Sequence, residues 1–223
     1  MKKVLILCAL ALNSFAYTQY ELHPSFKIYF KDCSLLMNKY YYINCYDYTY
    51  KGTKAIAYKL EAKILNQGHI KKRPKFKDDT NIPKKYRTYW EDYLRSGYTR
   101  GHVVSNQSMN ATSQAQLSTF LMSNITPQKK DINAEIWNEI EQRERYLAKK
   151  NKKLEVLNLV LYDDKPKRIK NNIAIPSFYV KILKAKNFTE CYKVPNNDNF
   201  ARFKRDYFKE NCKKYINNKE DKQ

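Results

Sequence analysis

One stretch of the chain, residues 98–142, constrains the fold more than any other. It carries a single histidine, His102, directly after the pair Arg100-Gly101. A glycine at this point allows another segment to approach closely, and two valines after the histidine continue a strand-like run. Apolar residues then recur at helical spacing, which predicts the strongest helix of the chain from about residue 131 to residue 150. The stretch therefore predicts a strand, a loop and a helix around one histidine.

Other segments are rich in apolar, aromatic or β-branched residues, the composition of strands. They are residues 46–50 and 54–60, which predict a hairpin, and residues 154–162 and 173–183. Residues 67–85 are polar, basic and interrupted by glycine and proline, which predicts a surface loop. Pro127 is expected to close a turn, Asp131 to cap the long helix at its N-terminus, and residues 200–210 to form a terminal helix.

The N-terminal segment has the composition of a targeting signal. Lys2 and Lys3 precede an apolar run, residues 4–12, and small residues lead to a cut after Ala16. We expect a cleaved signal peptide, residues 1–16, followed by a single domain, residues 17–223, that is exported to the periplasm or the extracellular medium. The apolar run is too short to span a bilayer and no later segment is longer, so we expect no membrane span.

The cysteines agree with that expectation. One of the five, Cys8, lies in the signal, which leaves an even number. An even number of cysteines in an exported chain indicates two disulfides, and three connectivities are open. We favour the local pairs Cys33–Cys45 and Cys191–Cys212. A four-cysteine zinc site is the alternative, but no pair separated by two residues is present to begin one.

Charge is the strongest global signal. Lysine and arginine number 43 against 22 aspartates and glutamates, and the formal net charge is +21, or +19 without Lys2 and Lys3. Such a chain suits a polyanionic partner: nucleic acid, an anionic membrane face or an acidic polysaccharide. The alternative is a solubility effect in a lysine-rich genome.

His102 and two helix residues suggest phosphodiester chemistry. Hydrolysis of a phosphodiester needs a base for water and a cation on the phosphate, and histidine is the commonest base near neutral pH. Asn133 and Glu141 are eight residues apart, so a helix places them on one stripe. An amide oxygen suits Mg²⁺, and a carboxylate can hold metal-bound water. The structural alternatives are a core histidine and a solvated helix face.

These residues carry a family resemblance. Arg100-Gly101-His102, the segment 120–128 with Asn124, and Asn133-x-x-x-Trp137-x-x-x-Glu141 resemble the signature of the DNA/RNA non-specific endonucleases, which are ββα-metal (His-Me finger) nucleases. The resemblance implies an α+β fold in which a central antiparallel sheet is flanked by helices. It implies a Mg²⁺-dependent endonuclease, with Mn²⁺ as a possible substitute, that cuts both DNA and RNA and leaves 5′-phosphates.

The resemblance also implies a role for each site residue. His102 would be the general base, Asn133 the protein ligand of a single Mg²⁺, and Glu141 a group that holds metal-bound water. Arg100 would stabilise the charged transition state, and Asn124 would hold the geometry of the site. A further arginine upstream faces the phosphate in the family, and Arg73 is the best match.

Two departures from the family pattern are visible. Thr99 stands where the family usually has aspartate before Arg-Gly-His, and Ser105-Asn106 stand where a Pro-Ala-like pair is preferred. Neither departure removes a group that would contact the metal or the substrate, so we expect activity. A non-catalytic, basic, exported protein that binds nucleic acid or another polyanion is the alternative, and a phosphodiesterase restricted to one polymer is a second. No oligomeric state follows from the sequence.

Overall fold

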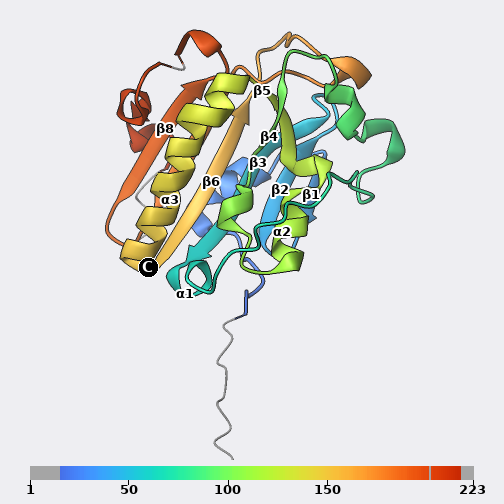
Figure 1. The fold of residues 1–223 in the computed structure, drawn as a ribbon. Helices are drawn as coiled ribbons and strands as arrows, with labels where there is room; N and C mark the ends of the chain where they lie inside the picture. The colour runs from blue at the N-terminus through green and yellow to red at the C-terminus, as the bar shows by residue number, and fades with distance from the viewer. Residues whose placement is uncertain (1–15, 201, 217–223) are drawn as a thin grey trace, which may run out of the picture.

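The protein is built on one antiparallel sheet, as seen in a computed structural model that describes residues 16–200 and 202–216. The strand order is β1-β2-β3-β6-β7-β8-β9 (Figure 1). These strands are β1 (Leu35–Asn38), β2 (Tyr42–Asp47), β3 (Gly52–Glu61), β6 (Lys153–Leu161), β7 (Phe178–Lys184), β8 (Thr189–Pro195) and β9 (Lys209–Glu210). A separate two-stranded ribbon joins β4 (Thr99–His102) to β5 (Ile125–Gln128). The α+β class with a central antiparallel sheet is therefore confirmed.

The central strands are apolar on both faces because both faces of the sheet are covered. Along β3, Ile56 and Tyr58 point into one core, whereas Ala55 and Ala57 point into the other. Successive side chains of a strand alternate between faces, so a strand in the middle of three layers needs apolar residues throughout. A hairpin of β2 and β3 is present in antiparallel register, with Tyr42 opposite Tyr58. Its first strand covers Tyr42–Asp47 instead of the predicted residues 46–50, and residues 48–51 form the turn.

Helical segments and the β4–β5 ribbon cover the face that carries the long helix. This helix starts with a π-helical segment, Ile132–Trp137, and continues as α3 (Asn138–Asn151), which packs on β3 and β6. The short α1 (Ala62–Leu65) contacts α3, and α2 (Ser113–Thr119) lies in the connection between β4 and β5. The predicted apolar stripe is buried, from Ile132 to Leu147. The stripe therefore fixes how the helix lies on the sheet.

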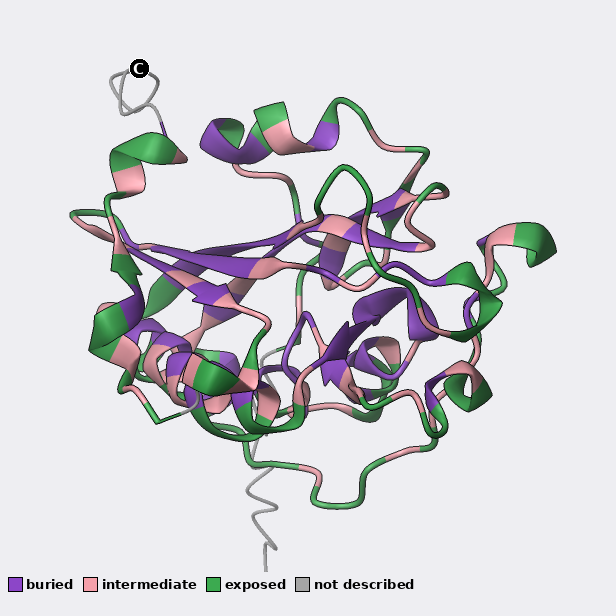
Figure 2. Ribbon diagram, turned by 90° about the horizontal axis from the view of Figure 1, so that it is seen from above, coloured by how far each residue is buried: buried purple, intermediate pink, exposed green. Residues whose placement is uncertain are grey.

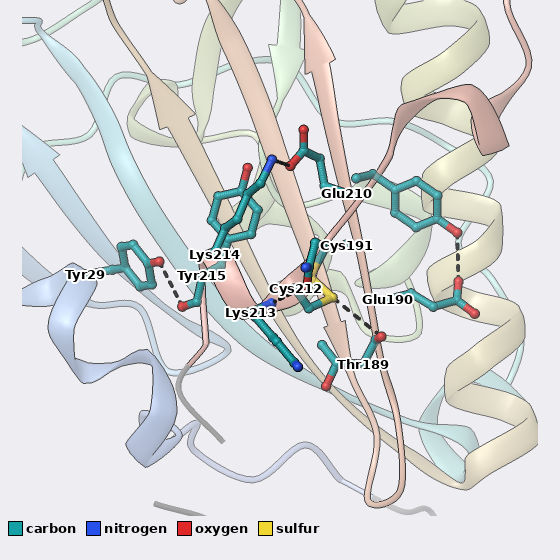
Figure 3. Close-up of a disulfide and its surroundings, with 11 residues drawn as sticks. Tyr29, Thr189, Glu190, Cys191, Glu210, Cys212, Lys213, Lys214 and Tyr215 are labelled. Carbon is teal, nitrogen blue, oxygen red and sulfur yellow. Dashed lines mark hydrogen bonds and ion pairs between the residues drawn. A yellow bond between two sulfur atoms is a disulfide. The ribbon is translucent and has the colours of Figure 1, made fainter. Parts of the chain in front are cut away.

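The opposite face is covered by the two ends of the described chain (Figure 2). The 3₁₀ helix Pro24–Phe30 buries Phe26 and Phe30 against it. Both favoured disulfides are present, Cys33–Cys45 and Cys191–Cys212. The second ties the C-terminal segment to β8, and beside it the hydroxyl of Tyr29 donates to the carbonyl of Tyr215 over 2.9 Å (Figure 3). The cysteines therefore fasten the terminal segments rather than the central strands.

Several sequence predictions are wrong in detail. The predicted terminal helix, residues 200–210, is absent from the described part of that segment: Arg205–Phe208 is a short 3₁₀ turn, and Lys209–Glu210 is β9, because the backbone there pairs with β8. Pro127 lies within β5, opposite Arg100, and not in a turn. Asp131 already has helical backbone angles, and its side chain does not cap the helix.

Strand boundaries also differ from the prediction. The strand that contains His102 ends at that residue, so the two valines that follow are outside it. The predicted strand 173–183 begins only at Phe178. The predicted signal peptide lies outside the described residues, apart from Ala16. Within the part of the chain that is described, no helix has the length and apolar character needed to cross a membrane.

Candidate active site

The site is built on the β4–β5 ribbon. In this ribbon His102 pairs with Ile125 and Gly101 pairs with Thr126. Gly101 is required by packing, since a Cβ atom there would lie 2.6 Å from the Cβ of Gln128. The helix that follows β5 completes a unit of two strands and one helix. This local order places His102 at the end of a strand, where its side chain can face a substrate.

Asn124 fixes the chain directly after His102. Its side chain is fully buried and forms a closed set of hydrogen bonds. Its Oδ1 accepts from the backbone N–H of Val104 over 2.8 Å, and its Nδ2 donates to the carbonyls of Val104 and Thr119 over 3.0 and 2.9 Å. Asn158 of β6 also donates to the carbonyl of Val103 over 2.8 Å. The turn after the histidine is therefore held from two sides.

The imidazole of His102 packs beside two phenyl rings, which also contact each other at 5.1 Å. Its centroid is 5.6 Å from that of Phe76 and 4.9 Å from that of Phe120. Its Nε2 is buried and accepts or donates no hydrogen bond within the described residues. Burial, together with the positive charge of Arg73, lowers the pKa of His102 to about 3. The ring is therefore neutral at physiological pH and can accept a proton.

Two arginines lie near His102, and each packs on one of the two phenyl rings that contact the imidazole. The Cζ of Arg73 lies 5.4 Å from the centroid of Phe120, and the Cζ of Arg100 lies 5.3 Å from that of Phe76. The loop that carries Arg73 is fastened at Lys77, whose N–H donates to the carbonyl of Phe120 over 3.0 Å. Two permanent positive charges beside a neutral imidazole are suited to an anionic, oxygen-rich group.

Asn133 is connected to this cluster through Thr99, the first residue of β4. The Nδ2 of Asn133 donates to the Oγ1 of Thr99 over 3.1 Å. Its backbone N–H donates to the carbonyl of Lys129 over 2.9 Å, and the residue lies in the π-helical segment. Such segments are frequent at functional sites, since they change the direction in which side chains leave the helix. The bond to Thr99 leaves the amide oxygen of Asn133 available for a ligand.

Glu141 contacts the loop after the histidine. Its Oε2 accepts a hydrogen bond from the hydroxyl of Ser105 over 2.8 Å. Burial raises the pKa of Glu141 to about 7, although the positive charge of Lys181 acts in the opposite direction. A cation beside this carboxyl would favour its charged form. The serine that departs from the family pattern is therefore a hydrogen-bond partner of the predicted water-holding residue.

The six predicted residues thus lie along β4 and the turn that follows it: Asn133 contacts Thr99 at the start of the strand, and Glu141 contacts Ser105 beyond its end. No group of three or more histidine, cysteine, aspartate or glutamate side chains that could hold a metal occurs in the described ranges, 16–200 and 202–216. A Mg²⁺ ion that keeps most of its waters needs no such cluster. The free amide oxygen of Asn133 is a hard, neutral donor, so the residues present fit such an ion.

Sequence reasoning missed two residues of the site region. Arg145 donates to Gln107 over 2.9 Å and reaches the hydroxyl of Ser105 at 3.4 Å. It follows Glu141 by four residues on the same helix, and this spacing could have identified it. Lys181, in the middle of β7, forms a fully buried ion pair with Glu144 of α3 at 2.5 Å. No local signal marks a lysine in an apolar strand as a partner of a distant helix.

The family model for DNA/RNA non-specific endonucleases matches residues 25–220. The chain belongs to this family. It is 30% identical over 167 residues to "Nuclease EXOG, mitochondrial" of Danio rerio, which covers 70% of this chain and 47% of that protein. It is also 30% identical over 165 residues to "Mitochondrial nuclease" of Saccharomyces cerevisiae, covering 67% of this chain and 50% of the relative. The chain therefore spans about half the length of these curated relatives.

A solved structure described as a complex of EndoG with EndoGI has the same fold. Its TM-score is 0.76 at 24% sequence identity, and the match covers 85% of each chain. This likeness supports the fold of the family, including the ββα-metal arrangement of β4, β5 and the long helix.

The relatives contradict the predicted destination. Residues 1–16 predicted export to the periplasm or medium, whereas the similar proteins from Danio rerio, Homo sapiens and Saccharomyces cerevisiae are named as mitochondrial nucleases. The prediction rested on lysines before a short apolar run and on the cysteine count. Both features are compositional, and residues 1–15 lie outside the described part of the structure.

Proposed function

We propose that this protein is a divalent-metal-dependent endonuclease that hydrolyses phosphodiester bonds in both DNA and RNA. The observation that carries the proposal is the buried Nε2 of His102, which has no hydrogen-bond partner in the described residues, while Arg73 and Arg100 pack on the two rings that contact the imidazole. The arrangement offers a proton acceptor and two permanent cations within one cluster.

His102 would act as the general base that deprotonates the attacking water. A general base must be neutral before the reaction, and the burial of His102 keeps it so. The negative phosphate would counter the charge of Arg73 and so raise the proton affinity of the ring when substrate is bound. Arg73 and Arg100 would bind the phosphate oxygens and stabilise the extra negative charge of the transition state.

A single Mg²⁺, with Mn²⁺ as a substitute, would be held through the amide oxygen of Asn133. When bound, such an ion polarises the phosphate and favours departure of the leaving oxygen. Glu141 would hold water bound to the ion, with Ser105 orienting its carboxylate through the 2.8 Å hydrogen bond. Asn124 would keep His102 in place through its bonds to Val104.

The absence of sequence and sugar preference would follow from charge. The formal net charge of +21 and the basic loop, residues 71–85, favour contacts with phosphates, which are the same at every base. None of the residues assigned to the reaction needs a 2′-hydroxyl. We therefore expect DNA and RNA to be cut by the same site.

The proposal is tested by incubating the oxidised protein with plasmid and with ribosomal RNA, in Mg²⁺ and in EDTA. We expect metal-dependent loss of both polymers, and His102→Ala should lower the rate by about 100- to 10,000-fold. The matched control is His23→Asn, since His23 lies at the start of the 3₁₀ helix Pro24–Phe30 and accepts a hydrogen bond there. Asparagine can keep that bond, so this variant should cut normally.

Other outcomes would contradict the proposal. Intact plasmid with retarded migration in every lane would identify a non-catalytic, basic binding protein. Loss of only one polymer would identify a phosphodiesterase with a narrower substrate. Unchanged cleavage by His102→Ala would show that His102 is not the general base.

A further inference from the structure

A hollow of about 640 Å³ adjoins the candidate site. It lies between the loop of residues 69–73, the turn of residues 106–110 and α3, and its lining includes Lys71, Arg73, Arg145, Tyr146 and Lys149. Arg73 and Arg145 connect the hollow to the site. Arg73 packs on the Phe120 ring that contacts His102, and Arg145 reaches the serine that binds Glu141. Its volume is within the range of about 300–1,000 Å³ that is typical of small-ligand sites.

The charge of the hollow predicts an anionic ligand. Four of its lining residues are lysine or arginine, and no aspartate or glutamate is among the described residues that line it. The cations are placed on both walls, with Lys71 and Arg73 on the loop and Arg145 and Lys149 on α3. Cations along two sides of a groove are the arrangement that follows a nucleic-acid backbone.

Tyr146 supplies a flat surface in the same hollow. The side chain is 52% exposed although it is a large aromatic residue. The Cζ of Arg143 lies 5.2 Å from its ring centroid, and Arg143 is itself held by Glu190, with a 3.0 Å bond from Nε to Oε2. The ring therefore packs on an anchored guanidinium. An exposed aromatic ring can stack on a nucleobase. The hollow thus combines cations on two walls with an exposed aromatic ring.

We propose that the hollow binds one unpaired nucleotide next to the phosphate that is cut. The base would stack on Tyr146, and its backbone phosphate would contact Lys71 and Lys149. A base within a duplex is already stacked on its neighbours, so only an unpaired base can present its face to Tyr146. The inference rests on the proposed nuclease function and adds a preference for single-stranded segments at this position.

The experiment measures binding without cleavage, in EDTA and with His102→Ala as the parent protein. Two fluorescent strands of about eight residues are compared, oligothymidine and a strand of abasic sites with the same charge. The parent should bind oligothymidine about fivefold or more tighter than the abasic strand, the ratio expected from stacking of one base. Tyr146→Ala should bring the two affinities close to each other, whereas Tyr146→Phe, which keeps the ring, should preserve the difference between them.

The cations are tested in the same assay. Lys149→Gln should weaken the binding of both strands equally. It should also lower the slope of the logarithm of affinity against the logarithm of salt concentration by about one. Lys150→Gln is the matched control, since it removes the same charge from the neighbouring exposed position of α3, which does not line the hollow. This control should change both affinities much less.

Three results would overturn the nucleotide subsite. They are equal binding of the two strands by the parent, equal losses for both strands in Tyr146→Ala, and a Tyr146→Phe variant as impaired as the alanine variant. Failure of the proposed function would be seen separately. If the ratio of the two affinities depends on Tyr146 but the wild-type protein cuts nothing in Mg²⁺, the subsite is present and the protein is not a nuclease.

Discussion

The hydroxyl of Thr99 determines which way the amide of Asn133 faces. The Oγ1 of Thr99 donates its proton to the carbonyl of Gln128 over 2.8 Å, so it can only accept at the position facing Asn133. The group that donates to it over 3.1 Å must therefore be the Nδ2 of Asn133, and the amide oxygen must point away. At the position where the family usually has aspartate, this chain therefore offers Asn133 a neutral hydroxyl.

Removal of that hydroxyl should weaken the binding of the metal. Thr99→Val keeps the shape of the side chain but leaves the amide of Asn133 free to rotate. We expect the Mg²⁺ concentration at half-maximal cleavage to rise by about 10- to 100-fold, the usual effect of losing a group that orients a ligand. Thr99→Ser, which keeps the hydroxyl, is the control. Identical Mg²⁺ titration curves for valine and threonine would contradict the assigned role.

His102 should make the stability of the protein depend on pH below neutrality. Burial, with a further contribution from Arg73, lowers the pKa of His102 to about 3, whereas a histidine in the unfolded chain titrates near pH 6.5. Between these values the unfolded chain binds a proton that the folded chain does not. The free energy of unfolding should therefore fall as the pH falls from about 6.5 toward 3, by at most about 1.4 kcal/mol per pH unit from this group.

Urea unfolding of the wild type and of His102→Leu at several pH values measures this contribution. Other groups titrate equally in both proteins, so the difference between the two curves reports the histidine. The wild type should lose stability more steeply on acidification. Parallel curves would show that the imidazole is solvated in the folded protein.

The buried ion pair of Lys181 and Glu144 should stabilise the fold only when both charges are present. Glu144 also accepts hydrogen bonds from Tyr58 at 2.9 Å and from Ser108 at 2.6 Å, so its carboxylate is enclosed by donors. Lys181→Met leaves a buried carboxylate without its counter-charge and should lower the free energy of unfolding by about 3–5 kcal/mol.

The double variant Lys181→Met with Glu144→Gln removes both charges. It should be less destabilised than the sum of the two single variants when all are unfolded in urea. Additive losses would mean that the two charges do not interact across the core.

The disulfide between Cys191 and Cys212 should stabilise the chain by closing a loop in the unfolded state. The cysteines are 21 residues apart, and a loop of this length corresponds to about 3 kcal/mol. Replacing both cysteines with alanine should lower the free energy of unfolding by about that amount under oxidising conditions. A reductant should then have less effect on the variant than on the wild type. An unchanged midpoint in urea would show that the terminal segment unfolds independently.

The local sequence pattern is enough to predict the elements whose structure depends on residues close together in the chain. The spacing of Ile132, Ile136 and Ile140 predicts the buried face of the long helix, because helical periodicity is a property of adjacent turns. The order of the histidine, the asparagines and the glutamate led to the right family. The hairpin of β2 and β3 and the two local cysteine pairs also follow from residues close in the chain.

The tertiary structure decided what depends on distant segments. The packing of Phe76 and Phe120 on His102 brings Arg73 and Arg100 to the imidazole, which the loop sequence alone does not specify. Pro127 looked like a turn residue, but pairing with Arg100 makes it part of a strand. Lys181 lies in an apolar strand whose sequence indicates no partner for it, and Glu144 lies opposite it in the core. In each case a contact between segments far apart in the chain outweighs the local preference, because burial and hydrogen bonding depend on neighbours in space.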